Sequence, residues 1–386
     1  MSKEVKIVVG ANYGDEGKGM MVRHFSKDAL QKNLNPIVIF HNGTAQRGHT
    51  VDYTEDFRHV YHHFGSATAE GVGTYYADTF MVHPMEFHRE YLELAAKGII
   101  PSNLSCDIDA QVITPYDMLV DHMTEDYIAL QNGKREYGSC GFGSWCASER
   151  TLKLTIGSLL SVIHQKIPYY ALMRIMFNEC KKVLEARGVD IERLPQYSEY
   201  FKIDSLRNSN LLYNFKDDVS FFEEKVVLMS FSSLYKKFDS FIFENGQGLG
   251  LDKDVDSEWC TTSHTGLYNP TMLLKDVKDF NAEVCYVTRS YLTRHGEGEL
   301  EEEVRQAEIN RLMEDKTNVR NNFQGSLRYG FLEDKEQKAR INKDWSLVAA
   351  DNRFTKAMAV THCNEFESEK EEKYMSNNKF SVVERK

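Results

Sequence analysis

Short apolar runs alternate with longer amphipathic stretches along the chain. The apolar runs are rich in β-branched and aromatic residues and end at turns or polar clusters, which predicts buried strands. These predicted strands are Val5–Gly10, Pro36–His41, Val226–Ser230, Phe238–Glu244, Ala282–Thr288 and Met358–His362. The stretches between them predict helices over Gly17–Leu30, Pro84–Lys97, Ile167–Arg187 and Glu302–Glu314.

Strands that alternate with helices favour a mostly parallel central sheet flanked by helices, so the predicted fold class is α/β. We expect one large domain over residues 1–386, with a helical insertion at about 84–225 and a polar, partly frayed tail at about 374–386. Sheets of this kind bind ligands beyond the carboxyl ends of their strands, and the motifs described below all fall there.

The first predicted strand runs directly into a glycine-rich loop, Gly10–Gly19, with the sequence GANYGDEGKG. Glycines let backbone N–H groups close on an anion and Lys18 adds a positive charge, so the loop is typical of a phosphate site. It differs from a standard P-loop, because Gly19 lacks the hydroxyl that would hold Mg²⁺. The acids Asp15 and Glu16 lie inside the loop instead, which indicates that Asp15 both does chemistry and binds Mg²⁺.

Three other glycine-rich segments carry candidate chemistry. In His41–Thr50, His49 follows a glycine near a strand end, as in a mobile catalytic loop. In Phe243–Asp252, Gln247 lies among glycines that can bring its amide to a planar ligand, and a run of hydroxyls follows at Thr261–Ser263. The third segment, Gly138–Ser144, is a glycine–hydroxyl loop with the character of an anion site.

Composition narrows the class of protein. A net charge of −11 argues against a nucleic-acid-binding surface. The seven cysteines form no CxxC pair, which is typical of reduced thiols in the cytoplasm. No apolar run reaches about 18 residues and the N-terminus lacks a signal-peptide core, so we expect a cytoplasmic protein without membrane partners.

Taken together, the motifs resemble the adenylosuccinate synthetase family. The family's Gly-Asp-Glu-Gly-Lys-Gly loop is matched identically by Gly14–Gly19, and its Gly-His-Thr loop by Gly48–Thr50. Phe243–Asp252 matches the family segment Phe-Glu-x-x-Gln-Gly followed by Leu-Asp, and Thr262-Ser263 matches its Thr-Ser phosphate contact. Tyr291–Gly298 matches the family segment Tyr-x-Thr-Arg-x-Gly-x-Gly. The resemblance spans residues 5 to about 365.

The resemblance implies a ligase that joins the amine of L-aspartate to C6 of a purine nucleoside monophosphate, driven by a nucleoside triphosphate. In this scheme Asp15 is the base that removes the purine N1 proton, His49 and Lys18 stabilise the transferring phosphoryl group, and Gln247 binds the 6-oxygen. Mg²⁺ is the expected cofactor, held by Asp15 and the Gly48 carbonyl.

The nucleotide and phosphate contacts implied by the family are more numerous. They are Gly14, Glu16, Gly17, Gly19, Gln46, Gly48, Thr50, Ser139, Cys140, Arg150, Thr262 and Asn364. Among them, Gln46, Cys140 and Thr262 fall at positions that contact the 5′-phosphate. The resemblance also implies a homodimer in which an arginine from the second subunit completes this site, and Arg150 is the candidate.

The chain departs from the family pattern at several positions that affect specificity. Gln46-Arg47 replaces Asn-Ala, and Gly138–Ser144 looks more like the viral branch of the family that acts on dGMP. Of the arginines in the family's aspartate loop only Arg328 is retained in register, with Arg294 or Arg320 as helpers; such an arginine can bind a carboxylate with two hydrogen bonds.

The residue that reads the base of the triphosphate also differs. The family's Thr-Lys-Leu-Asp becomes Thr361–Asn364, and an asparagine cannot accept two hydrogen bonds from guanine as a carboxylate does. GTP preference is therefore expected to be lost in favour of ATP or dATP. Asn364 follows a cysteine, as in the viral branch, but the best-known viral members replace the catalytic aspartate by serine, whereas Asp15 is present.

Three functions remain open at this point. IMP is the favoured substrate, because Asp15 suits the N1 proton of hypoxanthine. The alternative is the same chemistry on dGMP or GMP, with a 2-amino-succinoadenylate as product. The least favoured function is that of a nucleotide-binding regulator without catalysis.

Overall fold

A ten-stranded sheet forms the centre of the computed structural model, which describes residues 2–133, 140–164, 169–202, 204–257, 259–311, 318, 325–366 and 372–385. The strand order is β17-β16-β15-β11-β1-β10-β2-β5-β7-β9, and all neighbours pair in parallel except β16 and β17. The bounds are β1 Lys3–Gly10, β2 Pro36–Phe40, β5 Gly73–Tyr76, β7 Ser105–Cys106, β9 Val227–Leu228, β10 Ser240–Glu244, β11 Phe280–Arg289, β15 Phe354–Thr361, β16 Tyr374–Met375 and β17 Val383–Glu384.

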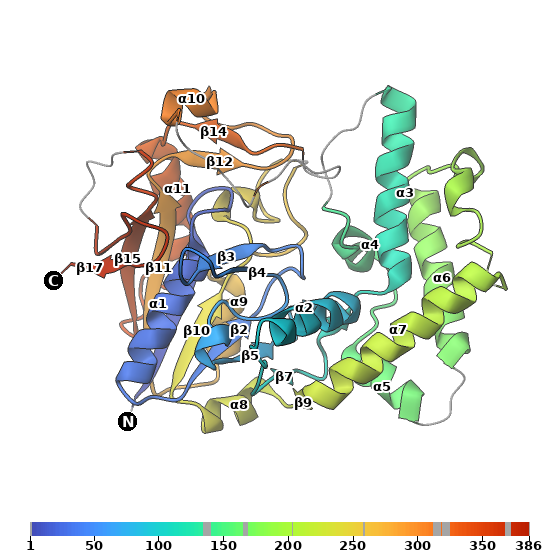
Figure 1. Ribbon diagram of the computed structural model, residues 1–386, viewed down its shortest axis with the longest axis horizontal. Helices are drawn as coiled ribbons and strands as arrows, with labels where there is room; N and C mark the ends of the chain where they lie inside the picture. The colour runs from blue at the N-terminus through green and yellow to red at the C-terminus, as the bar shows by residue number, and fades with distance from the viewer. Residues whose placement is uncertain are drawn as a thin grey trace.

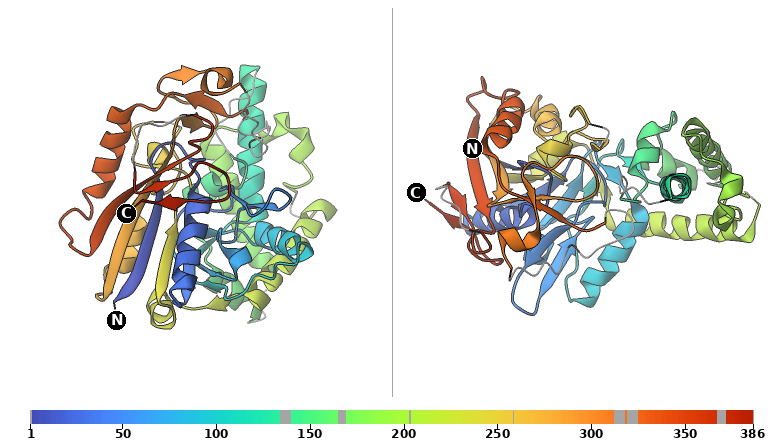
Figure 2. Two further views of the ribbon diagram at one scale, coloured as in Figure 1. Left: turned by 60° about the vertical axis from the view of Figure 1, so that its left-hand side comes forward. Right: turned by 90° about the horizontal axis from the view of Figure 1, so that it is seen from above.

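Helices cover both faces of this sheet, and a group of helices lies beside it (Figures 1 and 2). The helices that pack on the sheet are α1 Lys18–Gln31, α2 Pro84–Ala96, α8 Phe231–Lys237, α9 Tyr268–Leu274 and α11 Asp334–Trp345. Those in the group beside it are α3 Pro115–Asn132, α4 Ser144–Glu149, α5 Ile156–His164, α6 Tyr169–Ala186 and α7 Leu206–Lys225.

Small sheets and a short helix complete the described fold. A three-stranded sheet of β12 Leu292–Arg294, β14 Arg328–Gly330 and β13 Glu303–Val304 lies with α10 Gln306–Ile309 above one end of the central sheet in Figure 1. The other small sheets are the hairpin of β3 His49–Asp52 with β4 Arg58–Tyr61, and the pair β6 Met81–Val82 with β8 Gln111–Val112.

The apolar side chains of β1 point alternately to the two faces of the sheet, so both faces must be covered by helices. Val5, Ile7 and Val9 point to a core shared with α8, α9 and α11, whereas Val8 points to a core shared with α1, α2 and α7. A strand that buries both faces reads as a continuous apolar run, which is the pattern that predicted it. β1 lies between β10 and β11, so the loop after Gly10 leaves the sheet at its centre.

Most of the predicted elements are confirmed, with small shifts at their ends. The strands near 5–10, 36–41, 238–244, 282–288 and 358–362 are β1, β2, β10, β11 and β15, and the helices near 17–30, 84–97 and 167–187 are α1, α2 and α6. Helix α1 begins after Gly17, whose φ of 86° suits glycine, and α2 begins with Pro84. The division into one domain with a helical insertion stays a prediction.

Three predictions about local structure are wrong. The segment 226–230 is not a buried strand: Val227 and Leu228 form a short edge strand, and both are exposed. The predicted helix 302–314 is interrupted, because Glu303–Val304 joins a sheet and α10 ends at Ile309, and residues 312–317 lie outside the described part. The polar tail is not frayed over its described residues, since it adds β16 and β17 to the sheet.

The buried side chain of Tyr374 helps to anchor that tail. Tyr374 is 2% exposed and its ring meets Phe25 of α1 edge-on at 5.3 Å, while its hydroxyl donates to Glu283 at 2.6 Å. None of the helices in the described part of the chain is long and apolar enough to cross a membrane.

Buried histidines make the fold sensitive to acid. Burial lowers the pKa of His41 to about 3 and that of His83 to about 4. In the unfolded chain these histidines have pKa values near about 6.5, so between about pH 6.5 and pH 4 the unfolded chain binds protons that the folded chain does not bind. The free energy of unfolding therefore falls as the pH drops through this range.

We predict that His83→Asn reduces this loss. Asparagine can still accept the Glu86 N–H that His83 now caps at 3.3 Å, but it cannot be protonated in the unfolded state. Between pH 7 and pH 5 the drop in unfolding free energy should shrink by up to about 2 kcal/mol, since one pKa unit corresponds to about 1.4 kcal/mol. Urea unfolding at both pH values measures this. His164→Asn, at a side chain that is 61% exposed, is the control, and an unchanged pH dependence in His83→Asn would contradict the account.

Candidate active site

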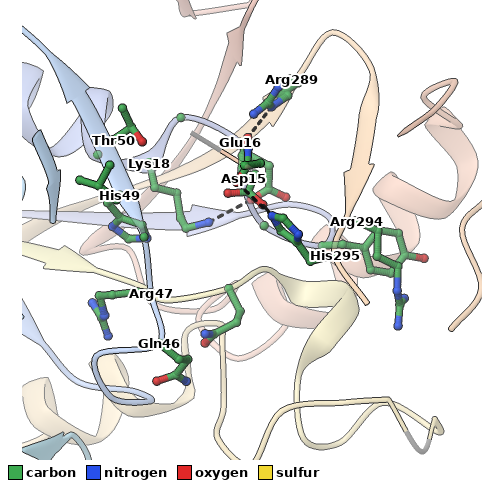
Figure 3. Close-up of a pocket in the computed structure, with 18 of the residues that line it drawn as sticks. Asp15, Glu16, Lys18, Gln46, Arg47, His49, Thr50, Arg289, Arg294 and His295 are labelled. Carbon is green, nitrogen blue, oxygen red and sulfur yellow. Dashed lines mark hydrogen bonds and ion pairs between the residues drawn. The ribbon is translucent and has the colours of Figure 1, made fainter. Parts of the chain in front are cut away.

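A cavity of about 970 Å³ lies at the carboxyl end of the central sheet. Its walls come from the loops that follow β1, β2, β10, β11 and β15, as expected for an open parallel sheet. The helical group contributes residues around 140–145, and the tail contributes Asn378–Phe380. Figure 3 shows the side chains that meet here.

The loop after β1 is organised around the buried carboxylate of Glu16. Its Oε1 accepts the Asn12 N–H at 2.5 Å, and its Oε2 lies 3.1 Å from Lys18 Nζ, with both side chains no more than 3% exposed. Gly10 makes room for this carboxylate, because a Cβ there would lie 2.1 Å from Glu16 Oε2. Glu16 therefore shapes the loop and balances the charge of Lys18, which lines the cavity together with Gly14, Gly17 and Gly19.

Asp15 presents its carboxylate to the cavity from a left-handed backbone conformation with φ of 56°. Its Oδ2 lies 3.2 Å from His295 Nε2, and its backbone carbonyl accepts a hydrogen bond from Arg289. Burial would raise the pKa of Asp15, but the hydrogen bond and charge of His295, with the charges of Arg289 and Lys18, hold that pKa well below its usual range. Asp15 is therefore an anion at neutral pH.

His49 is oriented by a buried carboxylate at the end of β10. Its Nδ1 lies 2.5 Å from Glu244 Oε1, and Ser66 donates to Glu244 from its backbone N–H at 3.0 Å and from its hydroxyl at 2.5 Å. Burial lowers the pKa of His49 although the bond to Glu244 opposes it. A carboxylate on Nδ1 fixes the imidazole ring and leaves Nε2 for a ligand, an arrangement found in many catalytic histidines.

The amide of Gln247 has a buried oxygen without a hydrogen-bond partner in the described part of the chain. Gln247 lines the cavity from a backbone with φ of 56°. Buried polar atoms are almost always satisfied, so an unsatisfied one at a cavity wall indicates a position for a ligand or a water. The unsatisfied atom is an acceptor and would take a donor of the ligand or of water, whereas a bond to the purine 6-oxygen would need the Gln247 amide N–H; that role stays a prediction.

Gln46 and Arg47, the two residues before Gly48, make different contacts. Gln46 lines the cavity and its Oε1 accepts the Thr44 N–H at 2.6 Å. Arg47 is 3% exposed, donates to the carbonyls of Glu244 at 2.9 Å and Asn42 at 2.5 Å, and lies over the Phe40 ring at 4.0 Å. Arg47 thus ties together the ends of β2 and β10.

Most of the other predicted nucleotide contacts also reach the cavity. Gly48, Thr50, Cys140 and Asn364 line it, and burial raises the pKa of the Cys140 thiol to about 12. Thr262 does not line it, although the adjacent Thr261 does, and Ser139 lies outside the described residues.

The structure contradicts the role predicted for Arg150. Its side chain has no exposed area and donates to both carboxylate oxygens of Asp117, from Nε at 2.6 Å and from an Nη at 3.1 Å. Further donors bind the carbonyls of Val112 and Leu152. A guanidinium held in this way inside the helical group cannot be offered to the cavity of a second subunit.

The two arginines predicted to bind aspartate are also engaged within the chain. Arg294 lines the cavity, but it donates to the carbonyls of Glu297 and Glu299, both at 3.0 Å. Arg328 does not line the cavity: it binds both carboxylate oxygens of Glu303 and the carbonyls of Gly296 at 3.0 Å and Gly298 at 2.8 Å. The carboxylate that Arg328 binds belongs to its own chain and not to a substrate.

Sequence reasoning missed Arg289 and His295. Both line the cavity and contact Asp15, and both lie in or beside the segment Tyr291–Gly298, of which only Arg294 was singled out. Arg289 ends β11, and a charged residue at the carboxyl end of a central strand was the available signal.

The oxygen donors at the loop fit a magnesium ion. Mg²⁺ takes one or two carboxylates with carbonyl, phosphate and water oxygens, and Asp15 and Gly48 both line the cavity beside the phosphate loop. Among the described residues, two other clusters of possible metal ligands occur, Asp117 with Cys146 and Cys180, and Asp252 with Asp254 and His264. Neither contains a residue of the predicted magnesium site.

A glycine-rich phosphate loop with an acid, a lysine and an oriented histidine at the carboxyl edge of a parallel sheet defines a nucleotide-binding α/β protein. The family model described as adenylosuccinate synthetase matches residues 7–374, and the chain belongs to this family. The resemblance noted in the sequence is thereby confirmed.

Similar proteins include the adenylosuccinate synthetases of Tropheryma whipplei (strain Twist), 27% identical over 302 residues, and Finegoldia magna, 23% identical over 308 residues. These alignments cover 76% and 79% of this chain and 63% and 67% of the relatives. The chain thus spans a little under two-thirds of the length of the first of them.

Two solved structures share the fold. One is the fully ligated adenylosuccinate synthetase from Plasmodium falciparum, with a TM-score of 0.64, 19% identity, and coverage of 93% of this chain and 77% of that chain. The other is the cyanophage S-2L succinoaminodeoxyadenylate synthetase bound to dGMP and dATP as an energy donor, with a TM-score of 0.62, 14% identity, and coverage of 100% and 96%. Both likenesses confirm the α/β fold class.

We predict that Arg150→Met destabilises the fold strongly. Removing one partner of a buried ion pair leaves the Asp117 carboxylate uncompensated, which costs about 3–5 kcal/mol. Chemical unfolding should show this loss, and nucleotide binding by the remaining folded protein should be unchanged. If Arg150→Met had the stability of the wild type but bound nucleotide more weakly, Arg150 would be a nucleotide-binding residue after all.

Proposed function

We propose that this protein is a purine nucleotide:L-aspartate ligase that uses IMP. The observation that carries the proposal is the anionic Asp15 inside a phosphate loop, in one cavity with Lys18, His49 and Gln247. A phosphate loop that only binds nucleotide has no need of a carboxylate there, because it would repel the phosphates. A carboxylate at this place is useful when a proton must leave the phosphoryl acceptor.

The first step makes the purine 6-oxygen a nucleophile. Asp15 takes the N1 proton, and the 6-oxygen attacks the γ-phosphorus while the bond to the nucleoside diphosphate breaks. Lys18 and His49 stabilise the charge on the transferring group, and Gln247 binds the 6-oxygen. Mg²⁺, when bound by Asp15 and the Gly48 carbonyl, would neutralise part of the phosphate charge.

The second step exchanges oxygen for nitrogen at C6. The amine of aspartate attacks C6, the C6–O6 bond breaks, and inorganic phosphate leaves with the former 6-oxygen and with the proton that the amine loses. The proton that Asp15 took from N1 is released to solvent. The product is adenylosuccinate. Homodimer formation belongs to the proposal as well, although Arg150 cannot be the shared residue.

A second candidate is the same chemistry on dGMP or GMP, giving N6-succino-2-amino-(deoxy)adenylate. Cys140 and Asn364, which both line the cavity, favour this candidate, because each lies in a segment whose sequence resembles the viral branch of the family. The cyanophage enzyme with the same fold was solved with dGMP and dATP, which adds support. Asp15 favours IMP, because it is suited to hypoxanthine and is replaced in the best-known viral members.

Asn364 also bears on the triphosphate. An amide has one donor and one acceptor, so it complements the N6 amino group and the ring nitrogen N1 of adenine. The N1–H and 2-amino groups of guanine are both donors, and together they need the two acceptor oxygens of a carboxylate. We therefore propose ATP or dATP as phosphoryl donor in preference to GTP.

The proposed function predicts a specific pattern of turnover. Purified protein is given IMP, GMP or dGMP with aspartate, Mg²⁺ and either ATP or GTP, and phosphate release and the succinylated product are measured. Turnover should need both aspartate and IMP, and ATP should exceed GTP by about 10- to 100-fold in kcat/KM, the worth of one good base contact. Turnover of dGMP but not of IMP would favour the second candidate. If no purine nucleotide were turned over, the protein would instead be a nucleotide-binding protein without catalysis.

We further predict that Asp15→Asn strongly slows ligation and leaves the fold intact. The amide keeps the shape of the side chain and cannot take the N1 proton, so kcat should fall by about 10²–10⁴ while the melting temperature stays near that of the wild type. Asp52→Asn, a change to another aspartate that lines the cavity and lies 3.8 Å from Arg58, is the matched control. Near-normal turnover by Asp15→Asn would refute its role as base.

A further inference from the structure

His295 is placed to control the orientation of Asp15. Its Nε2 lies 3.2 Å from Asp15 Oδ2 and 3.0 Å from Asn318 Oδ1, and the side chains of His295 and Asp15 are only 18% and 23% exposed. Figure 3 shows the imidazole directed at the carboxylate across the cavity wall. Because a carboxylate oxygen can only accept, Nε2 carries the hydrogen of this bond.

Asp15 needs an external partner to hold one orientation. The residue follows Gly14, whose φ is 102°, and itself has a φ of 56°, a left-handed conformation that is uncommon for residues other than glycine. Arg289 fixes the backbone carbonyl of Asp15 but leaves rotation about its side-chain bonds free. The contact with His295 acts on the carboxylate itself and restricts its rotation.

The segment that carries His295 is itself firmly held. Arg294, the residue before it, donates to the carbonyls of Glu297 and Glu299, and Arg328 donates to those of Gly296 and Gly298. The turn after β12 is thus closed by two guanidinium groups. The two arginines therefore restrain the turn that carries His295.

We propose that His295 is a positioning residue for the ligase reaction: its Nε2–H holds Asp15 Oδ2, so that Oδ1 is the oxygen that takes the purine N1 proton. The inference rests on the proposed function and adds to it a residue outside the phosphate loop. His295 exchanges no proton in this account. It acts only through the geometry of Asp15, and a misplacement of about 1 Å at a reacting group can cost about 100-fold in rate.

The experiment compares four variants of the full chain under the turnover conditions given above. His295→Ala removes the donor, His295→Phe keeps the ring volume without a donor, and His295→Gln offers an amide N–H at similar reach. His264→Ala is the matched control, because His264 is also partly buried, with Nδ1 3.4 Å from Asp252 Oδ1, but lies away from the cavity wall.

The expected result is a loss in kcat without a loss in binding. His295→Ala and His295→Phe should lower kcat by about 10- to 100-fold with KM values for all three substrates within about threefold of the wild type. His295→Gln should recover most of the rate, and His264→Ala should match the wild type. Wild-type kcat in His295→Ala, a change confined to KM, or no difference between His295→Gln and His295→Phe would each overturn the proposal.

A second measurement does not depend on turnover. In protein labelled with ¹⁵N-histidine, the imidazole signals of His295 should show a hydrogen on Nε2, and they should shift in Asp15→Ala but not in Asp52→Asn. If the imidazole signals of His295 did not shift in Asp15→Ala, the inference would be overturned even for an active enzyme. If the wild type turned over no purine, the proposed function would fail, and this measurement would still decide whether His295 holds Asp15.

Discussion

Three carboxylates at the carboxyl edge of the central sheet are each balanced by a donor: Glu16 and Glu244 are buried, and Asp15 is partly buried at the cavity wall. Glu16 is balanced by Lys18, Glu244 by His49 and Ser66, and Asp15 by His295. An unpaired buried carboxylate is costly, so these pairs determine how the loops after β1, β2 and β10 can lie. The groups that a phosphoryl transfer needs are thus brought together by the same pairing that lets the loops fold.

How far the sequence predicts this arrangement depends on the distance between partners. β1, its glycine loop and α1 are contiguous, and their pattern predicts the strand, the loop and the positions of Asp15 and Lys18. The ends of β2 and β10 were also predicted, with His49 and Gln247 beside them. Each of these features depends on neighbours a few residues away, where apolar periodicity and glycine positions carry the information.

The incorrect predictions share a physical reason, which is a partner far along the chain. Arg150 has the charge of a phosphate contact, but Asp117, 33 positions away, holds it inside the helical group. Arg328 has the chemistry of an aspartate clamp, but Glu303 occupies it. The tail has a polar composition, yet Tyr374 packs on Phe25 and makes it part of the sheet. His295 escaped notice because nothing in its immediate sequence indicates that Asp15 is its partner.

In the proposed reaction, Asp15 lets the purine 6-oxygen be phosphorylated, so that this oxygen can leave with the phosphate. The most direct test uses IMP labelled with ¹⁸O at the 6-position, together with ATP, aspartate and Mg²⁺, and determines the isotope content of the released phosphate by mass spectrometry. We expect the ¹⁸O label to move from the purine to inorganic phosphate in step with formation of the succinylated product. Unlabelled phosphate released at the same rate as that product would contradict it.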